Sequence, residues 1–128
     1  MTIARLRVLT LNVQNDEGGP RRIGVLNEGL RRVNADLVAL QEVLRTPARN
    51  QLDELLDGTG LQGTHQADLL AYSPPWADRY GGSAVASRWP HQLVEVLDLR
   101  LADAADVRWF TLAAFVPIPG DLDIGHDP

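Results

Sequence analysis

Two short apolar runs in the first third of the chain flank a stretch with helical periodicity. The runs are Leu6–Leu11 and Leu37–Leu40, and each has the length of a strand. Between them, apolar residues recur at three- and four-residue steps, at Ile23, Leu26, Leu30 and Val33. This order predicts a strand–helix–strand unit with parallel strands, which typically spans roughly thirty residues.

The predicted helix depends on its periodicity more than on its composition. Pro20 suits the first helical turn, where a missing N–H costs nothing. Gly24 and Gly29 each lower the helix propensity by about 1 kcal/mol relative to alanine. We therefore expect packing of the apolar stripe to supply most of the stability of this helix.

Polar residues follow each apolar run. Asn12 comes after the first run and Gln41–Glu42 after the second. Because the carboxyl ends of parallel strands are where ligands bind in open sheets, we expect Asn12 and Glu42 to lie at one functional edge. Carboxylate and amide oxygens suit Mg²⁺, which keeps several of its waters. The alternatives are a solvated strand end for Glu42 and a simple turn residue for Asn12.

Three segments together carry a family resemblance. They are Leu6–Asn12, Asp36–Val43 and Tyr80–Pro90, the last of which contains Ser87-Arg88-Trp89-Pro90. In order and approximate spacing they resemble the opening half of the endonuclease/exonuclease/phosphatase family, which includes DNase I-like nucleases. The resemblance implies an α/β fold that forms part of a two-sheet sandwich, with a strand–helix–strand opening unit and helices outside.

The resemblance also implies a function. It implies hydrolysis of phosphodiester or phosphomonoester bonds with Mg²⁺ or Mn²⁺ as cofactor, on a small molecule or a nucleic acid. Glu42 would bind the metal, and Asn12 would be the neighbouring amide in the shell of metal and phosphate. In the family, a later half supplies a catalytic histidine, a Gly-Asp-x-Asn segment and a terminal Asp-His pair. Since the chain ends at Pro128, we expect one incomplete domain over residues 1–128, with weak or absent activity.

The last residues allow three interpretations. Gly120–His126 resembles the Gly-Asp-x-Asn segment, with Asp121 in place and Asp123 where the family has asparagine. A second alignment places these residues on the strand that leads to the family's catalytic histidine, which would be His126. The two alignments exclude each other. The third interpretation is a frayed chain end.

The middle of the chain predicts a short helix followed by a long loop. Thr46 is a candidate cap with Pro47 in the first turn, and Gly58 is a candidate end. The core stripe of this helix would be Leu52, Leu55 and Leu56. We expect residues 60–82 to form a loop over the sheet edge.

Further features of that loop and of the second half are less specific. Trp76 or Tyr80 could stack on a substrate, although packed aromatic residues are the commoner case. We expect His65 and His91 to be surface or loop residues, because no spacing links them to a shared metal. Two more strands are predicted, over Leu93–Leu101 and Val107–Val116. Their unpaired apolar surface could be covered by a second copy or by a complementing segment.

Composition narrows the possible partners and location. The 128 residues are 45% hydrophobic and carry a net charge of −5, and the basic residues are all arginine. An acidic chain is a poor nonspecific binder of duplex DNA, which favours a smaller phosphate ester. Cysteine is absent, which excludes disulfides and cysteine nucleophiles. With no apolar stretch of about twenty residues and no secretory signal, the cytoplasm is the expected location.

Other catalytic schemes have little support. Gly81–Val85 lacks the final glycine of a serine-hydrolase elbow, and Gly18-Gly19 forms no dinucleotide or phosphate-loop fingerprint. Two hypotheses remain. The first is a magnesium-dependent phosphoesterase, complete only if another segment or subunit supplies the missing base and aspartates. The second is a noncatalytic remnant of the same fold that at most binds a metal or a partner through its unfinished sheet.

Overall fold

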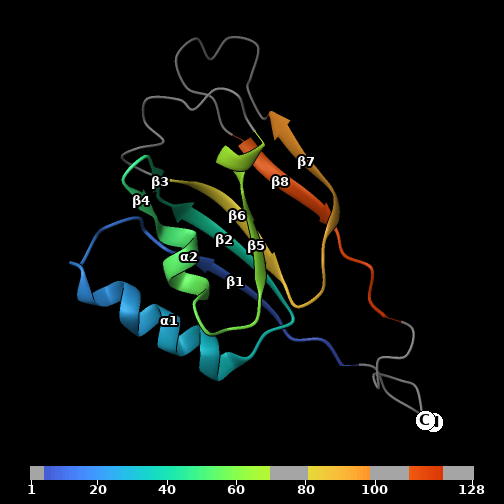
Figure 1. The fold of residues 1–128 in the computed structure, drawn as a ribbon, viewed down its shortest axis with the longest axis horizontal. Coiled ribbons are helices and arrows are strands. Elements are labelled where there is room, and N and C mark those ends of the chain that lie inside the picture. Colours follow the sequence, from blue (N-terminus) through green and yellow to red (C-terminus); the bar gives the residue numbers. More distant parts are fainter. Residues whose placement is uncertain (1–4, 70–80, 99–109, 120–128) are drawn as a thin grey trace.

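The main sheet has four strands and is built around the predicted strand–helix–strand unit. The computed structural model describes residues 5–69, 81–98 and 110–119. The strand order is β1-β2-β6-β5, with β1 parallel to β2 and the remaining neighbours antiparallel (Figure 1). The strand bounds are Val8–Asn12 for β1, Leu37–Val43 for β2, Gln62–His65 for β5 and Gly82–Ser87 for β6.

Helix α1 (Arg21–Val33) connects the two parallel strands, as the periodicity predicted. Its buried face includes Ile23 and Leu30. The helix ends at Asn34, which adopts the left-handed conformation with φ 52° and donates its N–H to the Leu30 carbonyl. Asparagine tolerates this conformation better than most residues, so the chain can turn into β2 within three residues.

The core consists of side chains aligned across the sheet. Strand pairing sets Leu11, Leu40, Ala84 and His65 side by side in one row, and Leu9, Val38, Ala86 and Gly63 in the next. Leu40, Val38 and both alanines are buried. Because neighbouring residues on one strand point to opposite faces, these rows define a single buried face of the sheet.

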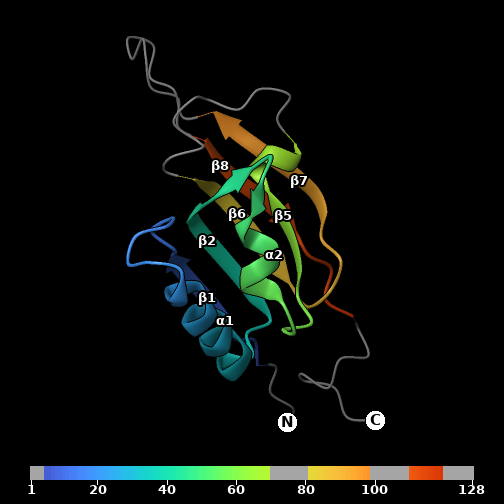
Figure 2. The ribbon, with the colours of Figure 1, turned by 60° about the vertical axis from the view of Figure 1, so that its left-hand side comes forward.

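Helix α2 (Gln51–Leu56) packs on this face beside α1 (Figure 2). A Cβ atom on Gly63 would lie 2.6 Å from Leu56 Cδ1 and 2.9 Å from Leu52 Cδ2, so the missing side chain lets α2 approach β5. Asn27 of α1 joins the helices, since its Nδ2 donates to the carbonyls of Leu55 (2.9 Å) and Asp57 (2.7 Å). Both helices therefore form one layer over one face of the sheet.

The predicted start of the second helix was wrong. Residues Arg45–Thr46 (β3) and Arg49–Asn50 (β4) form a small hairpin, and the helix begins after it. Thr46 Oγ1 accepts from the Ala48 N–H in the turn of this hairpin and so caps no helix. Asn50 is the cap, and its Oδ1 accepts from the Asp53 N–H at 3.1 Å.

The predicted long loop also contains regular structure. Strand β5 occupies its first part, and a 3-10 turn, η1 (Gln66–Asp68), follows directly. Glycine and glutamine made the sequence of β5 look like a loop, but pairing with β6 outweighs that weak propensity. Trp76 and Tyr80 lie outside the described residues.

The second half of the chain contributes a hairpin of β7 (Gln92–Asp98) and β8 (Phe110–Phe115). β8 lies within its predicted range, and β7 begins one residue before its own. Strand β8 contacts β6 and η1, and in both views the hairpin lies on the β5–β6 side, away from α1 (Figures 1 and 2). The fold is thus mixed α/β with several sheets, consistent with part of a DNase I-like sandwich. Of the helices in these ranges, none is both long and apolar enough for a membrane span.

The end of the sheet opposite to Glu42 is held by an ion pair. Arg88 Nε donates to Asp36 Oδ1 at 2.8 Å, and Arg88 Nη2 reaches Asn34 Oδ1 (2.8 Å) and the Ala35 carbonyl (3.0 Å). Burial raises the pKa of Asp36, but hydrogen bonds from the Arg7 N–H and from Arg88 outweigh it and leave that pKa below its ordinary value. Arg88 therefore fastens β6 to the turn that precedes β2.

We expect Arg88→Met to lower the free energy of unfolding by about 1–2 kcal/mol, because several charge-assisted bonds are lost at a partly exposed site. Urea denaturation measures this. Arg32→Met is the matched control, since Arg32 forms an ion pair with Glu28 in which the side chains are 79% and 57% exposed. The control should change stability by less than about 0.5 kcal/mol. Equal losses in the two variants would contradict this role of Arg88.

Candidate functional site

The structure brings the ends of β1 and β2 together at one edge, as the sequence predicted. Asn12 is the register partner of Gln41, the residue before Glu42. The pairing continues past β1, because the Val13 N–H donates to the Gln41 carbonyl (2.8 Å) and the Asn15 N–H donates to the Glu42 carbonyl (2.9 Å). Asn12 is exposed, and its Oδ1 accepts from the Gln14 N–H at 2.9 Å. The amide oxygen keeps its second lone pair and Nδ2 keeps its donors.

Glu42 has an unusual backbone conformation. Its φ is 56°, in the left-handed region that non-glycine residues rarely adopt. The pairing of β2 with β6 shifts register between Leu40 and Val43, which marks a bulge at this point. Bulges redirect side chains and are common beside active sites. The Glu42 side chain is therefore placed by a local break in the strand and not by regular alternation.

Gly81 lies against the peptide of Glu42. A Cβ atom on Gly81 would lie 2.6 Å from the Glu42 carbonyl carbon and 2.7 Å from the backbone nitrogen of Val43. Gly81 also has φ 83°. Two independent constraints, close approach and a left-handed backbone, thus require glycine immediately before β6.

His65 supports the next peptide, between Val43 and Leu44, and our expectation of a surface or loop histidine was wrong. The residue ends β5 and is 2% exposed. Its Nε2 bonds to the Val43 carbonyl at 2.7 Å, and its Nδ1 accepts from the Ala67 N–H at 3.0 Å. A neutral ring with the proton on Nε2 satisfies both bonds.

Burial lowers the pKa of His65 below its ordinary value of 6.5. The bond to the Val43 carbonyl opposes this shift, and the positive charge of Arg45 adds to it. His91, in the connection after β6, has a pKa lowered by burial as well. Its ring bonds to Thr64 Oγ1 (2.8 Å) and to Ser87 Oγ. Burial of both rings thus favours their neutral forms.

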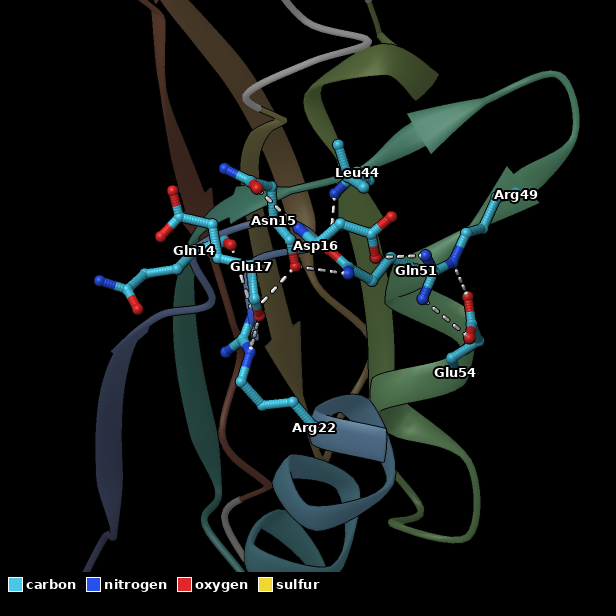
Figure 3. A network of polar contacts seen from close by, with 9 residues as sticks. All are labelled: Gln14, Asn15, Asp16, Glu17, Arg22, Leu44, Arg49, Gln51 and Glu54. Carbon is cyan, nitrogen blue, oxygen red and sulfur yellow. Dashed lines mark hydrogen bonds and ion pairs between the residues drawn. The ribbon is translucent and has the colours of Figure 1, made fainter. Parts of the chain in front are cut away.

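The loop after β1, residues 13–19, is fixed by long polar side chains (Figure 3). Arg22 donates to the carbonyls of Gln14 (3.2 Å) and Asn15 (3.0 Å), and also to that of Glu17. Arg49 pairs with Asp16 and with Glu54, which links the loop to α2. The loop beside Asn12 is therefore held in place by both helices.

Buried amides complete the support of this edge. Gln51 is fully buried and bonds to the Leu44 N–H (2.8 Å) and the Asn15 carbonyl (2.9 Å). Gln66 is 4% exposed, and its Oε1 accepts from the Ser83 N–H at 2.8 Å. Sequence analysis missed these residues and His65. A usable signal was that Gln51 precedes Leu55 by four residues, which puts a polar residue on the core face of a helix.

The other predicted site residues are Asp121, Asp123 and His126, which lie outside the described residues. Within residues 5–69, 81–98 and 110–119, no three histidine or acidic side chains form a group that could hold a metal ion. Zinc-type sites with three protein ligands therefore have no candidate there. One carboxylate with an amide and waters remains compatible with Mg²⁺.

Comparison with known families agrees with this geometry. The family model described as "Endonuclease/Exonuclease/phosphatase family" matches residues 9–126. The chain belongs to the endonuclease/exonuclease/phosphatase family. The comparisons with curated proteins and with solved structures found no match. Membership in this family supports a hydrolase of the phosphoesterase and nuclease type, with a phosphate ester or nucleic acid as substrate.

We expect Gly81→Ala to destabilise the protein by more than about 2 kcal/mol, because alanine would add left-handed strain and a clash with the Glu42 peptide. Gly24→Ala is the control. Gly24 lies in α1 with open space around it, so alanine there should stabilise by up to about 1 kcal/mol. Thermal unfolding of both variants tests this, and a neutral Gly81→Ala would refute the close approach.

We expect stability to fall as the pH drops from 7.5 to 5.5. The folded state disfavours the protonated forms of His65 and His91, whereas the unfolded chain takes up protons near pH 6.5, so unfolding is favoured below that pH. The carboxyls of Asp36 and Asp68 titrate below this window, since their pKa values are lowered from 3.8. Urea denaturation at several pH values measures the slope. His91→Gln should make it shallower, and a flat profile for the parent chain would contradict the expectation.

Proposed function

We propose that this chain is a magnesium-dependent phosphoesterase in which Glu42 binds the metal beside Asn12. The observation that carries the proposal is the joint placement of these two residues at the carboxyl edge of the parallel pair β1–β2. The backbone of Glu42 is held in a rare conformation by Gly81, Asn15 and His65 through its own and the next peptide. Such conformations persist only where the surroundings enforce them, and they cluster at functional sites.

The donor chemistry of this edge fits Mg²⁺. The Glu42 carboxylate is partly exposed and accepts no hydrogen bond from the residues that the structure describes, so its oxygens are available to an ion. When bound, Mg²⁺ neutralises charge on the phosphoryl oxygens and stabilises the leaving oxygen. Glu42 would hold the ion, and Asn12 Nδ2 would donate to a phosphoryl oxygen while its Oδ1 stays bonded to the Gln14 N–H.

A base must activate the attacking water, and the candidates singled out from the sequence lie near the end of the chain. His126 is one candidate, and Asp121 with Asp123 form the other. In the proposal, the group that acts as the base takes a proton from a water molecule while the oxygen of that water attacks phosphorus and the ester oxygen leaves. Both candidates lie outside the described residues.

A noncatalytic role is the second candidate function. The observation that favours it is that, within the described ranges, neither Glu42 nor any other residue belongs to a group of three or more histidine or acidic side chains that could hold a metal ion. In that case the edge would bind a metal weakly or bind a partner without turnover. Measurement of metal-dependent hydrolysis separates the two functions.

We expect the protein to hydrolyse bis(4-nitrophenyl) phosphate only when Mg²⁺ or Mn²⁺ is present, and Glu42→Gln to lower kcat/KM by about 100-fold or more. Glu28→Gln is the control, because Glu28 is an exposed carboxylate on α1 that forms an ion pair with Arg32. It should keep the activity of the parent chain. Turnover that survives in Glu42→Gln would overturn the metal role, and absence of turnover in a folded parent would favour the noncatalytic function.

A further inference from the structure

We infer that Gln51 is a positioning residue for the proposed metal site, which it serves by tying the segment after Glu42 to the segment after Asn12. The part of the inference that concerns metal binding rests on the proposed function. Gln51 does not touch the ion or the substrate in this scheme. It acts through the backbone of Leu44 and of Asn15 (Figure 3).

The first tie is to the strand that carries Glu42. Gln51 Oε1 accepts from the Leu44 N–H at 2.8 Å, and the Gln51 N–H donates to the Leu44 carbonyl at 3.1 Å. Leu44 follows Glu42 by two residues, so both of its backbone polar groups are bound by one residue of α2. This fixes the chain where it leaves the bulge of β2.

The second tie is to the loop that follows Asn12. Gln51 Nε2 donates to the Asn15 carbonyl at 2.9 Å, and the Asn15 N–H donates to the Glu42 carbonyl at 2.9 Å. The backbone of Asn15 is thus held between Gln51 and Glu42. Gln51 therefore adds a side-chain link between the two candidate ligand segments to the backbone bonds that join them directly.

The burial and the hydrogen bonds of Gln51 explain why an amide occupies this position. Gln51 is 0% exposed and lies among leucines of α2 that are also buried. A buried amide is tolerable only when its hydrogen bonds are made, and here both the donor and the acceptor are used. An apolar residue of similar size would fill the space equally well, so the amide contributes specificity of backbone position, which packing alone does not supply.

A comparison with the other buried polar side chains also supports the positioning role of Gln51. Asn27 is buried and donates two bonds, but both go to α2 carbonyls, at Leu55 and Asp57, far in the chain from either candidate ligand. Gln66 and His65 each support only the β2–β6 side of the edge. Of these four residues, only Gln51 bonds both to the segment after β1 and to the segment after β2.

The test compares Gln51→Met with Asn27→Leu, since each removes a buried amide at nearly constant volume. The probe is Mn²⁺, whose dissociation constant is measured from paramagnetic broadening of protein NMR signals. We expect Gln51→Met to raise this constant by about 10-fold or more, as is typical when a group that orients metal ligands is lost. Asn27→Leu should leave it within about twofold, even though both variants lose stability.

A second measurement separates the inference from the proposed function. Hydrogen exchange of the Leu44 and Asn15 amides should become faster in Gln51→Met and stay unchanged, relative to global stability, in Asn27→Leu. If the parent chain binds no Mn²⁺, the proposed function fails, and selective exchange at these amides still decides whether Gln51 fixes the backbone. Unchanged exchange, or equal Mn²⁺ losses in the two variants, overturns the inference. If Gln51→Met does not fold, Gln51→Glu replaces it, because glutamate keeps the acceptor for Leu44 and loses the donor to Asn15.

Discussion

The left-handed backbone conformation of Glu42 is the constraint on which the edge formed by the ends of β1 and β2 depends. A strand that continued regularly through Glu42 would have no bulge, and Gly81 would not need to approach its peptide so closely. Instead, polar contacts converge on residues 42–44 from the loop after β1, from α2 and from the end of β5. The strain at one residue is thus balanced by hydrogen bonds that come from three parts of the chain.

In the core of the sheet, by contrast, side-chain packing and not hydrogen bonding fixes the arrangement. There the contacts are largely apolar and depend on size, with leucines and a valine on β1 and β2, alanines on β6 and Gly63 on β5. Gly63 leaves the space that α2 fills with Leu52 and Leu56. Packing therefore determines where the helices lie, whereas the polar network determines how the strand ends meet.

The sequence predicted the parts that depend on local periodicity. Apolar runs and helical periodicity were sufficient for β1, α1, β2 and the two later strands, though not for the pairing of β7 with β8, and the parallel crossover placed Asn12 and Glu42 at one edge. It could not predict β5, because Gln62 and Gly63 have low strand propensity and gain their conformation from pairing with β6. His65 and Gln51 were missed for a related reason. A buried polar side chain is recognisable only once its backbone partners, distant in sequence, are known.

The strand order has a consequence for how the chain folds. β6 lies between β2 and β5, and within the described ranges β5 pairs with no strand other than β6. Paired residues of β1 and β2 are 29 positions apart in the chain, whereas those of β2 and β6 are 39 to 50 positions apart, so the second pairing costs slightly more chain entropy. Gly81 reaches the Glu42 peptide, and His65 reaches the Val43 carbonyl, only when β6 and β5 have joined the sheet. The edge that carries the candidate ligands is consequently complete only when these two strands are paired with the unit that supplies Asn12 and Glu42.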